Sequence, residues 1–137
     1  MTDNVLTRDT ETLFEGSETV ACNLLLVEDD ALSRRNLAIF FQQSEQNVHE
    51  ADTGEIAVEL IDRITFDVVV SDFRLPGRLR GVDVLRHHFR HFPEKRRILV
   101  TAFGSDQLRL QAENLHAHYF EKPVSLNHLL QTLLPAT

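Results

Sequence analysis

Acidic, basic and hydroxyl side chains stand where the apolar segments of this chain end. Val68, Val69 and Val70 form an apolar run that stops at Asp72, and Pro76-Gly77 then turns the chain. β-branched residues favour extended backbone, and an apolar run without alternation is typical of a strand covered on both faces. A single aspartate at a strand end often only accepts hydrogen bonds from loop amides. Chemistry at Asp72 therefore depends on what lies beside it.

Three other apolar runs end in similar residues, which are Glu28-Asp29-Asp30, Thr101 and Lys122. Because open α/β sheets gather the carboxyl ends of their strands at one edge, we expect these side chains to surround Asp72. Crowded carboxylates raise one another's pKa values unless a cation lies among them. Mg²⁺ suits such hard oxygen ligands and also accepts a phosphate oxygen. With an ammonium and a hydroxyl group nearby, this set can hold a phosphoryl group with a carboxylate in line as the nucleophile.

The remaining pattern predicts the elements that position these residues. Short apolar strands at 24–27, 47–51, 66–71, 98–101 and 117–121 alternate with helices at roughly 31–45, 53–64, 82–92, 105–115 and 125–134. Thr53, Ser105 and Ser125 are expected N-caps, and Pro93 ends the third helix. This alternation predicts an α/β fold with a five-stranded parallel sheet, doubly wound with right-handed crossovers. The leucine stripe of the last helix should pack on the sheet: Leu126, Leu129, Leu130, Leu133 and Leu134.

Composition limits the class of protein. The 137 residues suffice for one domain with one core. No apolar run approaches the ~20 residues of a membrane span, and the polar N-terminus is unlike a secretory signal. A single cysteine, Cys22, allows no intrachain disulfide and predicts a cytoplasmic location. The net charge is −7, of which −4 lies in residues 1–21, whereas nucleic-acid binding favours basic chains. We predict a flexible acidic tail over 1–21 and one domain over 22–137.

From about Asn23 to Leu134 the chain resembles a response-regulator receiver domain of two-component signalling. The matching motifs are Leu25-Leu26-Val27-Glu28-Asp29-Asp30, Ser71-Asp72-Phe73-Arg74-Leu75-Pro76-Gly77, Leu99-Val100-Thr101-Ala102 and Tyr119-Phe120-Glu121-Lys122-Pro123. The resemblance implies the flavodoxin-like strand order 2-1-3-4-5 for the receiver domain at 22–137.

The resemblance also implies roles for the acidic residues. Asp72 would take a phosphoryl group from a phosphohistidine on a sensor histidine kinase or a histidine phosphotransfer protein. Glu28 and Asp29 would hold Mg²⁺ together with Asp72 and the backbone carbonyl of Arg74. Asp30 matches a position where the family varies, so we place it outside the metal shell.

The other matched residues concern the phosphoryl group and the switch. Lys122 would contact the phosphoryl group, and its bond to Pro123 is expected to be cis. Thr101 would move toward that group, and Tyr119 would swing inward behind it. Such a domain is not an enzyme toward other substrates, because it catalyses only its own phosphorylation and dephosphorylation. Its output would be a protein contact, through the face of the fourth helix, fifth strand and fifth helix, and not nucleic acid or membrane.

Three features depart from the common family pattern. The loop from Pro76 to Gly81 is about one residue longer than usual, Arg74 is a large cation, and Phe103 is bulky and apolar. A hydrolytic water in line with Asp72 would have to pass between Arg74 and Phe103, so both side chains favour a long-lived phosphorylated state. Two roles stay open for Arg74, which are donation to a phosphoryl oxygen or, in the metal-free state, an approach to Glu28 and Asp29 as a substitute cation.

Other functions remain as alternatives. The domain could be a pseudo-receiver that binds without being phosphorylated, or the receiver part of a longer regulator with a separate output domain. An aspartate-nucleophile phosphatase usually has a second Asp where this chain has Arg74. A flavodoxin-type flavin carrier needs a phosphate-binding loop where this chain has Glu28-Asp29-Asp30. Incubation with acetyl phosphate and Mg²⁺, followed by intact mass, would separate these classes.

Two further groups have simpler interpretations. His87 and His91 have the i, i+4 spacing of metal ligands, but no third ligand is apparent from the sequence, and His88 faces the apolar side. A basic segment carries a net charge of +6 over residues 74–97, through Arg74, Arg78, Arg80, Arg86, Arg90, Lys95, Arg96 and Arg97. We favour a solvated face for it, with a docking surface for an acidic partner, such as the chain's own tail, as the alternative.

Overall fold

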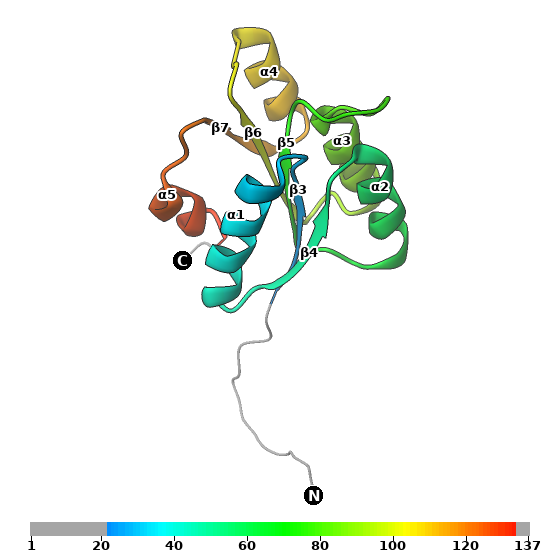
Figure 1. Ribbon diagram of the computed structural model, residues 1–137. Coiled ribbons are helices and arrows are strands. Elements are labelled where there is room, and N and C mark those ends of the chain that lie inside the picture. The colour runs from blue at the N-terminus through cyan, green and yellow to red at the C-terminus, as the bar shows by residue number, and fades with distance from the viewer. Residues whose placement is uncertain (1–21, 134–137) are drawn as a thin grey trace, which may run out of the picture.

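The computed structural model describes residues 22–133, and the predicted tail at 1–21 lies outside them. Within the described residues, five strands alternate with five helices (Figure 1). The strands are β3 (Asn23–Val27), β4 (Asn47–Ala51), β5 (Val68–Asp72), β6 (Arg96–Thr101) and β7 (Ala117–Glu121). The helices are α1 (Ala31–Gln43), α2 (Gly54–Arg63), α3 (Gly81–His91), α4 (Asp106–Asn114) and α5 (Leu126–Gln131).

All strand pairs are parallel, and the sheet order is β4-β3-β5-β6-β7. In order of sequence this is 2-1-3-4-5, so the predicted flavodoxin-like α/β fold is confirmed. The β3, β5 and β6 strands lie in the middle, and Val68, Val69 and Val70 are buried, as the uninterrupted apolar run predicts. The edge strands β4 and β7 are only half-buried.

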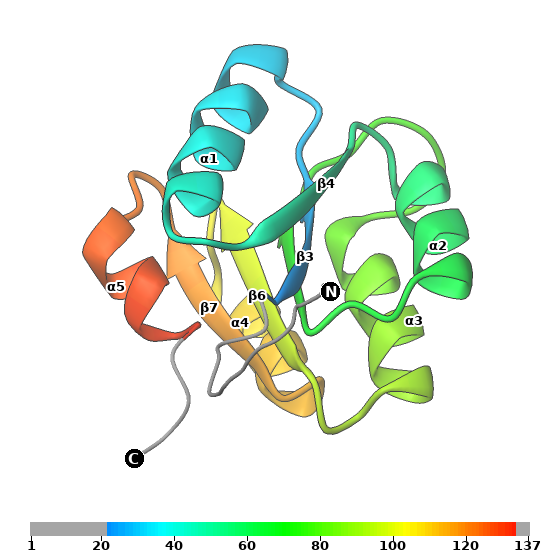
Figure 2. The ribbon, with the colours of Figure 1, turned by 90° about the horizontal axis from the view of Figure 1, so that it is seen from below.

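The helices cover both faces of the sheet and make two cores (Figure 2). On one face, Leu25, Val69 and Leu99 pack against apolar side chains of α2, α3 and α4. On the other face, Leu26 and Val70 of neighbouring strands pack against α1 and α5. Alternate side chains of a strand point to opposite faces, so each central strand contributes to both cores.

The helix starts follow from hydrogen-bonding side chains. Thr53, Ser105 and Ser125 accept hydrogen bonds from backbone amides in the first turns of α2, α4 and α5, as predicted. Asp30 does the same for α1, where its Oδ2 accepts from the Ser33 amide at 2.8 Å. The first helix ends at Gln43, two residues earlier than predicted, and Glu45 turns the chain with a left-handed φ of 66°.

The last helix is shorter than its leucine stripe suggests. Leu129 and Leu133 are buried, but Leu126 is 42% exposed, because α5 only begins there. Leu134 lies outside the described residues. The expectation that the whole stripe packs on the sheet is therefore wrong for Leu126. Within residues 22–133, none of the helices has the length and apolar character that crossing a membrane requires.

Candidate functional site

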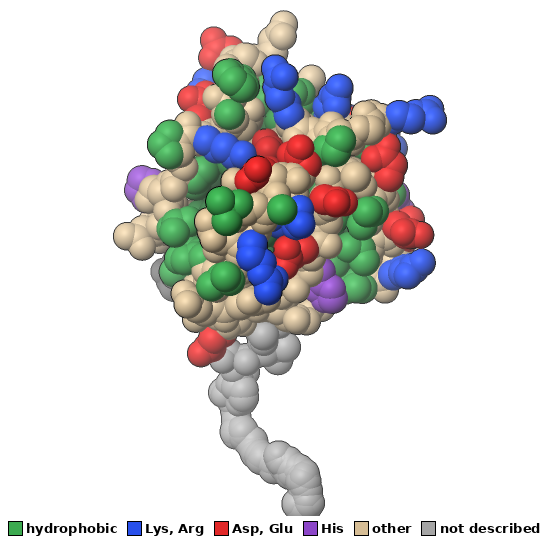
Figure 3. All heavy atoms as spheres, in the orientation of Figure 1, with side chains coloured by type: hydrophobic (Ala, Val, Ile, Leu, Met, Phe, Trp, Pro, Cys, Tyr) green, Lys and Arg blue, Asp and Glu red, His purple; other side chains and the backbone are tan. Residues whose placement is uncertain are grey.

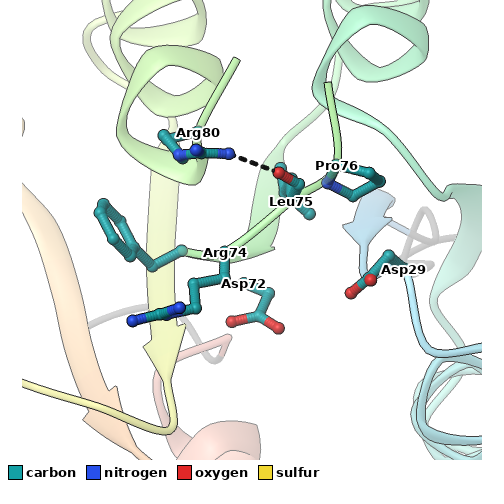
Figure 4. A pocket seen from close by; sticks show the side chains of 7 residues that line it. Asp29, Asp72, Arg74, Leu75, Pro76 and Arg80 are labelled. Atoms are coloured by element: carbon teal, nitrogen blue, oxygen red, sulfur yellow. Dashed lines mark hydrogen bonds between the residues drawn. The ribbon is translucent and has the colours of Figure 1, made fainter. Parts of the chain in front are cut away.

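The carboxyl ends of the central strands bring three acidic side chains together. Glu28 and Asp29 directly follow β3, and Asp72 is the last residue of β5. Oxygen atoms of these three carboxylates lie within 4.8 Å of one another. Figure 4 shows the Asp29 and Asp72 side chains facing the same space. The register of the sheet explains this, because Val27 pairs with Ser71 and so places the ends of β3 and β5 side by side.

Lys122 supplies the positive charge of this group. Its Nζ lies 3.1 Å from Glu28 Oε1 and 3.2 Å from Asp72 Oδ2. The bond from Lys122 to Pro123 is cis. The Lys122 backbone amide donates to the carbonyl of Thr101 at 2.8 Å, which fixes the segment after β7 against the end of β6. One ammonium group thus bridges the carboxylates of Glu28 and Asp72 but forms no ion pair with Asp29.

Burial and charge shift the pKa values in this group. Burial raises the pKa of Glu28, and the Asp72 carboxylate raises it further, although bonds from the Asp30 amide and Lys122 oppose the rise. Burial alone would lower the pKa of Lys122, but Glu28 and Asp72 together outweigh burial and raise it. The ammonium group therefore stays charged, and a further cation beside Glu28 would favour the ionised form of its carboxyl group.

The backbone after β5 leaves a cavity open beside the carboxylates. This cavity of about 520 Å³ is lined by Asp29, Asp72, Phe73, Arg74, Leu75, Pro76 and Arg80. Gly81 lets α3 approach closely, because a Cβ there would lie 2.1 Å from the carbonyl oxygen of Asp72. Gly77 turns the loop with a φ of +90°.

Two residues for which the sequence predicts no role in this loop support it. Arg80 Nη1 donates to the carbonyl of Leu75 at 2.6 Å, as Figure 4 shows. Glu55 Oε2 accepts from the backbone amide of Arg78 at 2.9 Å, and this bond lowers the pKa of Glu55. The extra length of the loop predicts that side chains must hydrogen-bond to its backbone. The sequence does not show which side chains form these bonds.

Thr101 is the last residue of β6, and Tyr119 lies in the middle of the neighbouring strand β7. Thr101 is 1% exposed, and its Oγ1 accepts from the Phe103 amide at 3.1 Å. The Tyr119 hydroxyl donates to Glu121 Oε2 at 3.1 Å and accepts from the Ser105 amide at 3.2 Å. Burial and Glu121 raise the pKa of Tyr119. In this state the Tyr119 hydroxyl is therefore bound to the loop that follows Thr101.

Arg74 lies differently from the prediction for the metal-free state. Its guanidinium carbon is 5.3 Å from the centroid of the Phe103 ring, and Figure 4 shows the guanidinium directed away from the Asp72 carboxylate. The expected approach of Arg74 to Glu28 and Asp29 is wrong. The physical reason is that Lys122 already neutralises part of the carboxylate charge, while the 71% exposed Phe103 offers Arg74 an aromatic face.

The histidine prediction also needs correction. Asp62 of α2 supplies the third potential ligand beside His87 and His91, and ligand atoms of the three lie within 4.8 Å of one another. The sequence could not reveal this, because Asp62 precedes His87 by 25 residues and only helix packing joins them. His88 is buried, as predicted.

The basic segment is not one solvated face. Arg97 is 1% exposed and lies in the core, Lys95 pairs with Asp67 at 2.8 Å, and Arg96 donates to the carbonyl of Leu133. Figure 3 shows Lys and Arg side chains scattered among acidic ones on the face it presents. The interpretation as a single solvated surface is therefore wrong, and this weakens the alternative of a docking surface over the whole segment.

The carboxylate group is chemically suited to a hard divalent cation. Three acidic side chains against one ammonium leave negative charge to be balanced, the pKa of Glu28 is raised, and a cavity opens beside Asp29 and Asp72. Carboxylate oxygens with room for water and a phosphate oxygen are what Mg²⁺ prefers. The Asp72 carboxylate lines this cavity with the Lys122 ammonium 3.2 Å away, and the buried Thr101 ends the neighbouring strand β6.

Known proteins share this chain's sequence pattern. Residues 24–134 match the family model of the response regulator receiver domain. The chain is 34% identical over 107 residues to a cyclic di-GMP phosphodiesterase of Thermotoga maritima, covering 77% of this chain and 28% of that protein. It is 30% identical over 113 residues to the response regulator protein PilR of Pseudomonas aeruginosa, covering 82% of this chain and 25% of that protein. The chain thus spans about a quarter of the length of these relatives.

Solved structures share the fold. A receiver domain described as CheY-like, from Methanospirillum hungatei, superposes with a TM-score of 0.78 at 23% identity, covering 83% of this chain and 91% of that one. The non-phosphorylated HemR receiver domain of Leptospira biflexa superposes with a TM-score of 0.74 at 30% identity, covering 85% and 98%. With the family match over residues 24–134, these likenesses show that the chain belongs to the response regulator receiver domain family of two-component signalling.

Proposed function

We propose that the chain is a phosphoacceptor module that receives a phosphoryl group on Asp72 from a phosphohistidine of a partner kinase or phosphotransfer protein. The observation that carries this proposal is the position of the Asp72 carboxylate. It lies beside Glu28 and Asp29, 3.2 Å from the Lys122 ammonium, at the edge of an open cavity. An aspartate that only stabilised its loop would need neither the two acidic neighbours nor the cavity.

In the transfer, an Asp72 carboxylate oxygen attacks phosphorus and the phosphorus–nitrogen bond of the phosphohistidine breaks. The bonding electron pair leaves with the imidazole nitrogen, and Asp72 becomes an acyl phosphate. Glu28, Asp29, Asp72 and the Arg74 carbonyl would hold Mg²⁺, which supplies neutralising charge to the phosphoryl oxygens. Lys122 already contacts Glu28 and Asp72, and its ammonium group would then contact the phosphoryl group on Asp72.

The switch would involve Thr101, the last residue of β6, and Tyr119, in the middle of β7. The Thr101 hydroxyl accepts a single amide hydrogen bond within its own loop, so it can turn to donate to a phosphoryl oxygen. Tyr119 would then have to give up Glu121 and the Ser105 amide to move behind Thr101. We propose that this rearrangement of the α4-β7-α5 face is what a downstream protein recognises, without direct contact to nucleic acid or membrane.

The relatives suggest a wider setting. We propose a cytoplasmic receiver of a two-component pathway, which either acts alone or serves a longer regulator. The second option is supported by curated relatives that are several times longer than the matched region. One solved relative, from Burkholderia pseudomallei, is described with a phosphorylated aspartic acid and a calcium ion, and a DrrB receiver domain is described as activated by BeF3. Both descriptions fit the phosphorylation of Asp72 that we propose for this chain.

The decisive experiment is incubation with acetyl phosphate and Mg²⁺, followed by intact mass. The wild-type chain should gain one phosphoryl group, and Asp72→Asn should gain none. Asp52→Asn is the matched control, because Asp52 is an exposed acid that follows the neighbouring strand β4, and it should be labelled like wild type. Equal labelling of Asp72→Asn would overturn the assignment, and an unlabelled wild type would favour a pseudo-receiver.

A further inference from the structure

A second group of potential metal ligands lies between α2 and α3, which run side by side on one face of the sheet (Figure 2). Asp62 belongs to the last turn of α2, and His87 and His91 stand one turn apart at the end of α3. One ligand atom from each lies within 4.8 Å of the others. The two imidazole rings are 4.7 Å apart between centroids, so both nitrogen ligands face the same side of the helix.

A single hydrogen bond fixes the tautomer of neutral His91. Its Nδ1 lies 2.9 Å from the backbone carbonyl of His87. A carbonyl oxygen only accepts, so Nδ1 carries the hydrogen and donates it, which leaves the lone pair of neutral His91 on Nε2. A ring N–H held by a backbone carbonyl is the usual arrangement behind a metal-binding histidine.

His87 and Asp62 share a hydrogen that a cation can replace. His87 Nε2 lies 2.7 Å from Asp62 Oδ1. Tetrahedral coordination with metal–ligand bonds of 2.0–2.2 Å separates two ligands by about 3.4 Å, so these atoms would part by roughly 0.7 Å. That adjustment is open to them, because the Asp62 side chain is 57% exposed and that of His87 is 25% exposed. The adjacent Arg63 is directed to Glu59, at 3.4 Å.

We propose that Asp62, His87 and His91 form a binding site for a divalent first-row transition metal such as Zn²⁺. Two imidazole nitrogens and one carboxylate oxygen are ligands that suit Zn²⁺, whereas Mg²⁺ prefers oxygen ligands alone. Three protein ligands leave a fourth position for water or for a ligand from a partner. The metal would tie the end of α2 to the end of α3.

This site is independent of the phosphoacceptor site. In a parallel α/β sheet the helices end near the amino ends of the strands. His88, within the last turn of α3, accordingly contacts the carbonyl of Phe66, ahead of β5, at 3.0 Å. Asp72 stands at the other end of that strand. Loss of the histidine site should therefore leave Asp72 labelling unchanged, and the proposal holds whether or not Asp72 is phosphorylated.

The test is calorimetric titration of ZnCl₂ into the full chain without an affinity tag, in excess Mg²⁺ to occupy the carboxylate site. We expect one Zn²⁺ per chain. Loss of an outer partner of a metal ligand typically costs about ten- to a hundredfold in affinity, so loss of the ligand in His91→Ala should cost at least about tenfold. Asp62→Asn should also bind more weakly. His128→Ala removes an exposed histidine of α5, on the other face of the sheet, and should bind like wild type.

A second measurement guards against variants that fold poorly. Co²⁺ added to the wild-type chain should give the visible absorption of a site with nitrogen ligands, and Zn²⁺ should displace it. Circular dichroism would establish that His91→Ala is folded. If His91→Ala binds Zn²⁺ as tightly as wild type, or if wild type shows neither a stoichiometric Zn²⁺ site nor a Co²⁺ spectrum, the proposal is overturned and Asp62–His87 is only an ion pair.

Discussion

At the scale of single residues, the contact between Arg74 and Phe103 ties together two side chains that border the phosphoacceptor site. The guanidinium lies 5.3 Å from the ring centroid, and such a contact is worth about 0.5–1 kcal/mol at exposed positions. Each side chain therefore helps to hold the other in place. We propose that the pair limits how water reaches a phosphoryl group on Asp72, because the Phe103 ring has bulk and offers no hydrogen bond to orient a water.

If the Arg74–Phe103 pair acts as a gate for water, it determines the lifetime of the phosphorylated state. Phe103→Glu supplies a polar group that can orient water, and Arg74→Asn removes the cation that covers the ring, so both should lose phosphate faster than wild type. Misplaced reactants cost on the order of a hundredfold in rate, so an acceleration of about ten- to a hundredfold is expected. The measurement follows phosphate loss after the small phosphodonor is removed. Because the two side chains touch, the double variant should accelerate by less than the product of the single effects.

Leu110→Glu controls for the effect of adding a negative charge to the surface away from the site. Leu110 of α4 is 57% exposed and is not among the residues that line the cavity. Its decay should match wild type. If neither Phe103→Glu nor Arg74→Asn changes the decay rate, the pair is not the gate.

At the scale of elements, Arg97 joins β6 to the ends of two helices. Its guanidinium donates to the carbonyls of Phe92 and Pro93, beyond the end of α3, and to the carbonyl of Leu115 at the end of α4, each at 3.0 Å. Helix ends leave carbonyl groups without partners and carry partial negative charge, so they favour a cation. The buried charge is thus stabilised by neutral acceptors.

His88 completes this arrangement as a neutral acceptor. Its Nδ1 accepts from Arg97 at 3.0 Å, and its Nε2–H donates to the carbonyl of Phe66 at 3.0 Å. Burial lowers the pKa of His88 to about 4, and Arg97 contributes to the lowering. Protonation would place two positive charges beside each other in the core.

The low pKa of His88 predicts a specific acid sensitivity. The unfolded chain takes up this proton near pH 6.5 and the folded chain only near pH 4, so the stability from neutral His88 is lost as pH falls from about 6.5 through 4. The shift corresponds to roughly 3 kcal/mol of unfolding free energy. His88→Gln keeps one acceptor and one donor without titrating, so urea unfolding at pH 7 and pH 4.5 should show a smaller loss than for wild type. His128→Gln, at an exposed histidine, should behave like wild type; an equal loss in His88→Gln would contradict the assignment.

These elements also show what the sequence can and cannot predict. The strands, the helix caps and the acidic strand ends follow from local patterns, because periodicity and the geometry of parallel sheets determine them. The burial of Arg97 could not be predicted from the sequence. A charged residue is expected at the surface, and only tertiary packing brings three carbonyls around the Arg97 guanidinium. The meeting of Asp62 with His87, and of Arg74 with Phe103, depends in the same way on contacts between distant segments.

At the scale of the whole molecule, the three carboxylates of the proposed phosphoacceptor site lower the stability of the fold, and a bound cation would restore it. Within residues 22–133, Lys122 forms ion pairs with Glu28 and Asp72, and the nearby Asp29 has no such partner. The pKa of Glu28 is higher in the folded chain than in the unfolded chain. The free energy of unfolding therefore falls as pH rises above the pKa that Glu28 has in the unfolded chain. Like charges gathered in one place repel one another, so the metal-free fold is less stable than its packing alone would allow.

This cost predicts how the melting temperature responds to Mg²⁺. A ligand that binds only the folded state at about 100 times its dissociation constant adds about 2.7 kcal/mol, and for a domain of this size each kcal/mol raises the melting temperature by roughly 4 °C. Wild type should therefore gain roughly 10 °C. Asp29→Ala should melt higher than wild type without metal, because one repelling charge is gone, and by only a few degrees since exposed charges contribute little. It should also lose most of the Mg²⁺ response, whereas Asp52→Asn should keep it. Thermal melts with Mg²⁺ and with chelator measure both effects, and an undiminished response in Asp29→Ala would place the metal elsewhere.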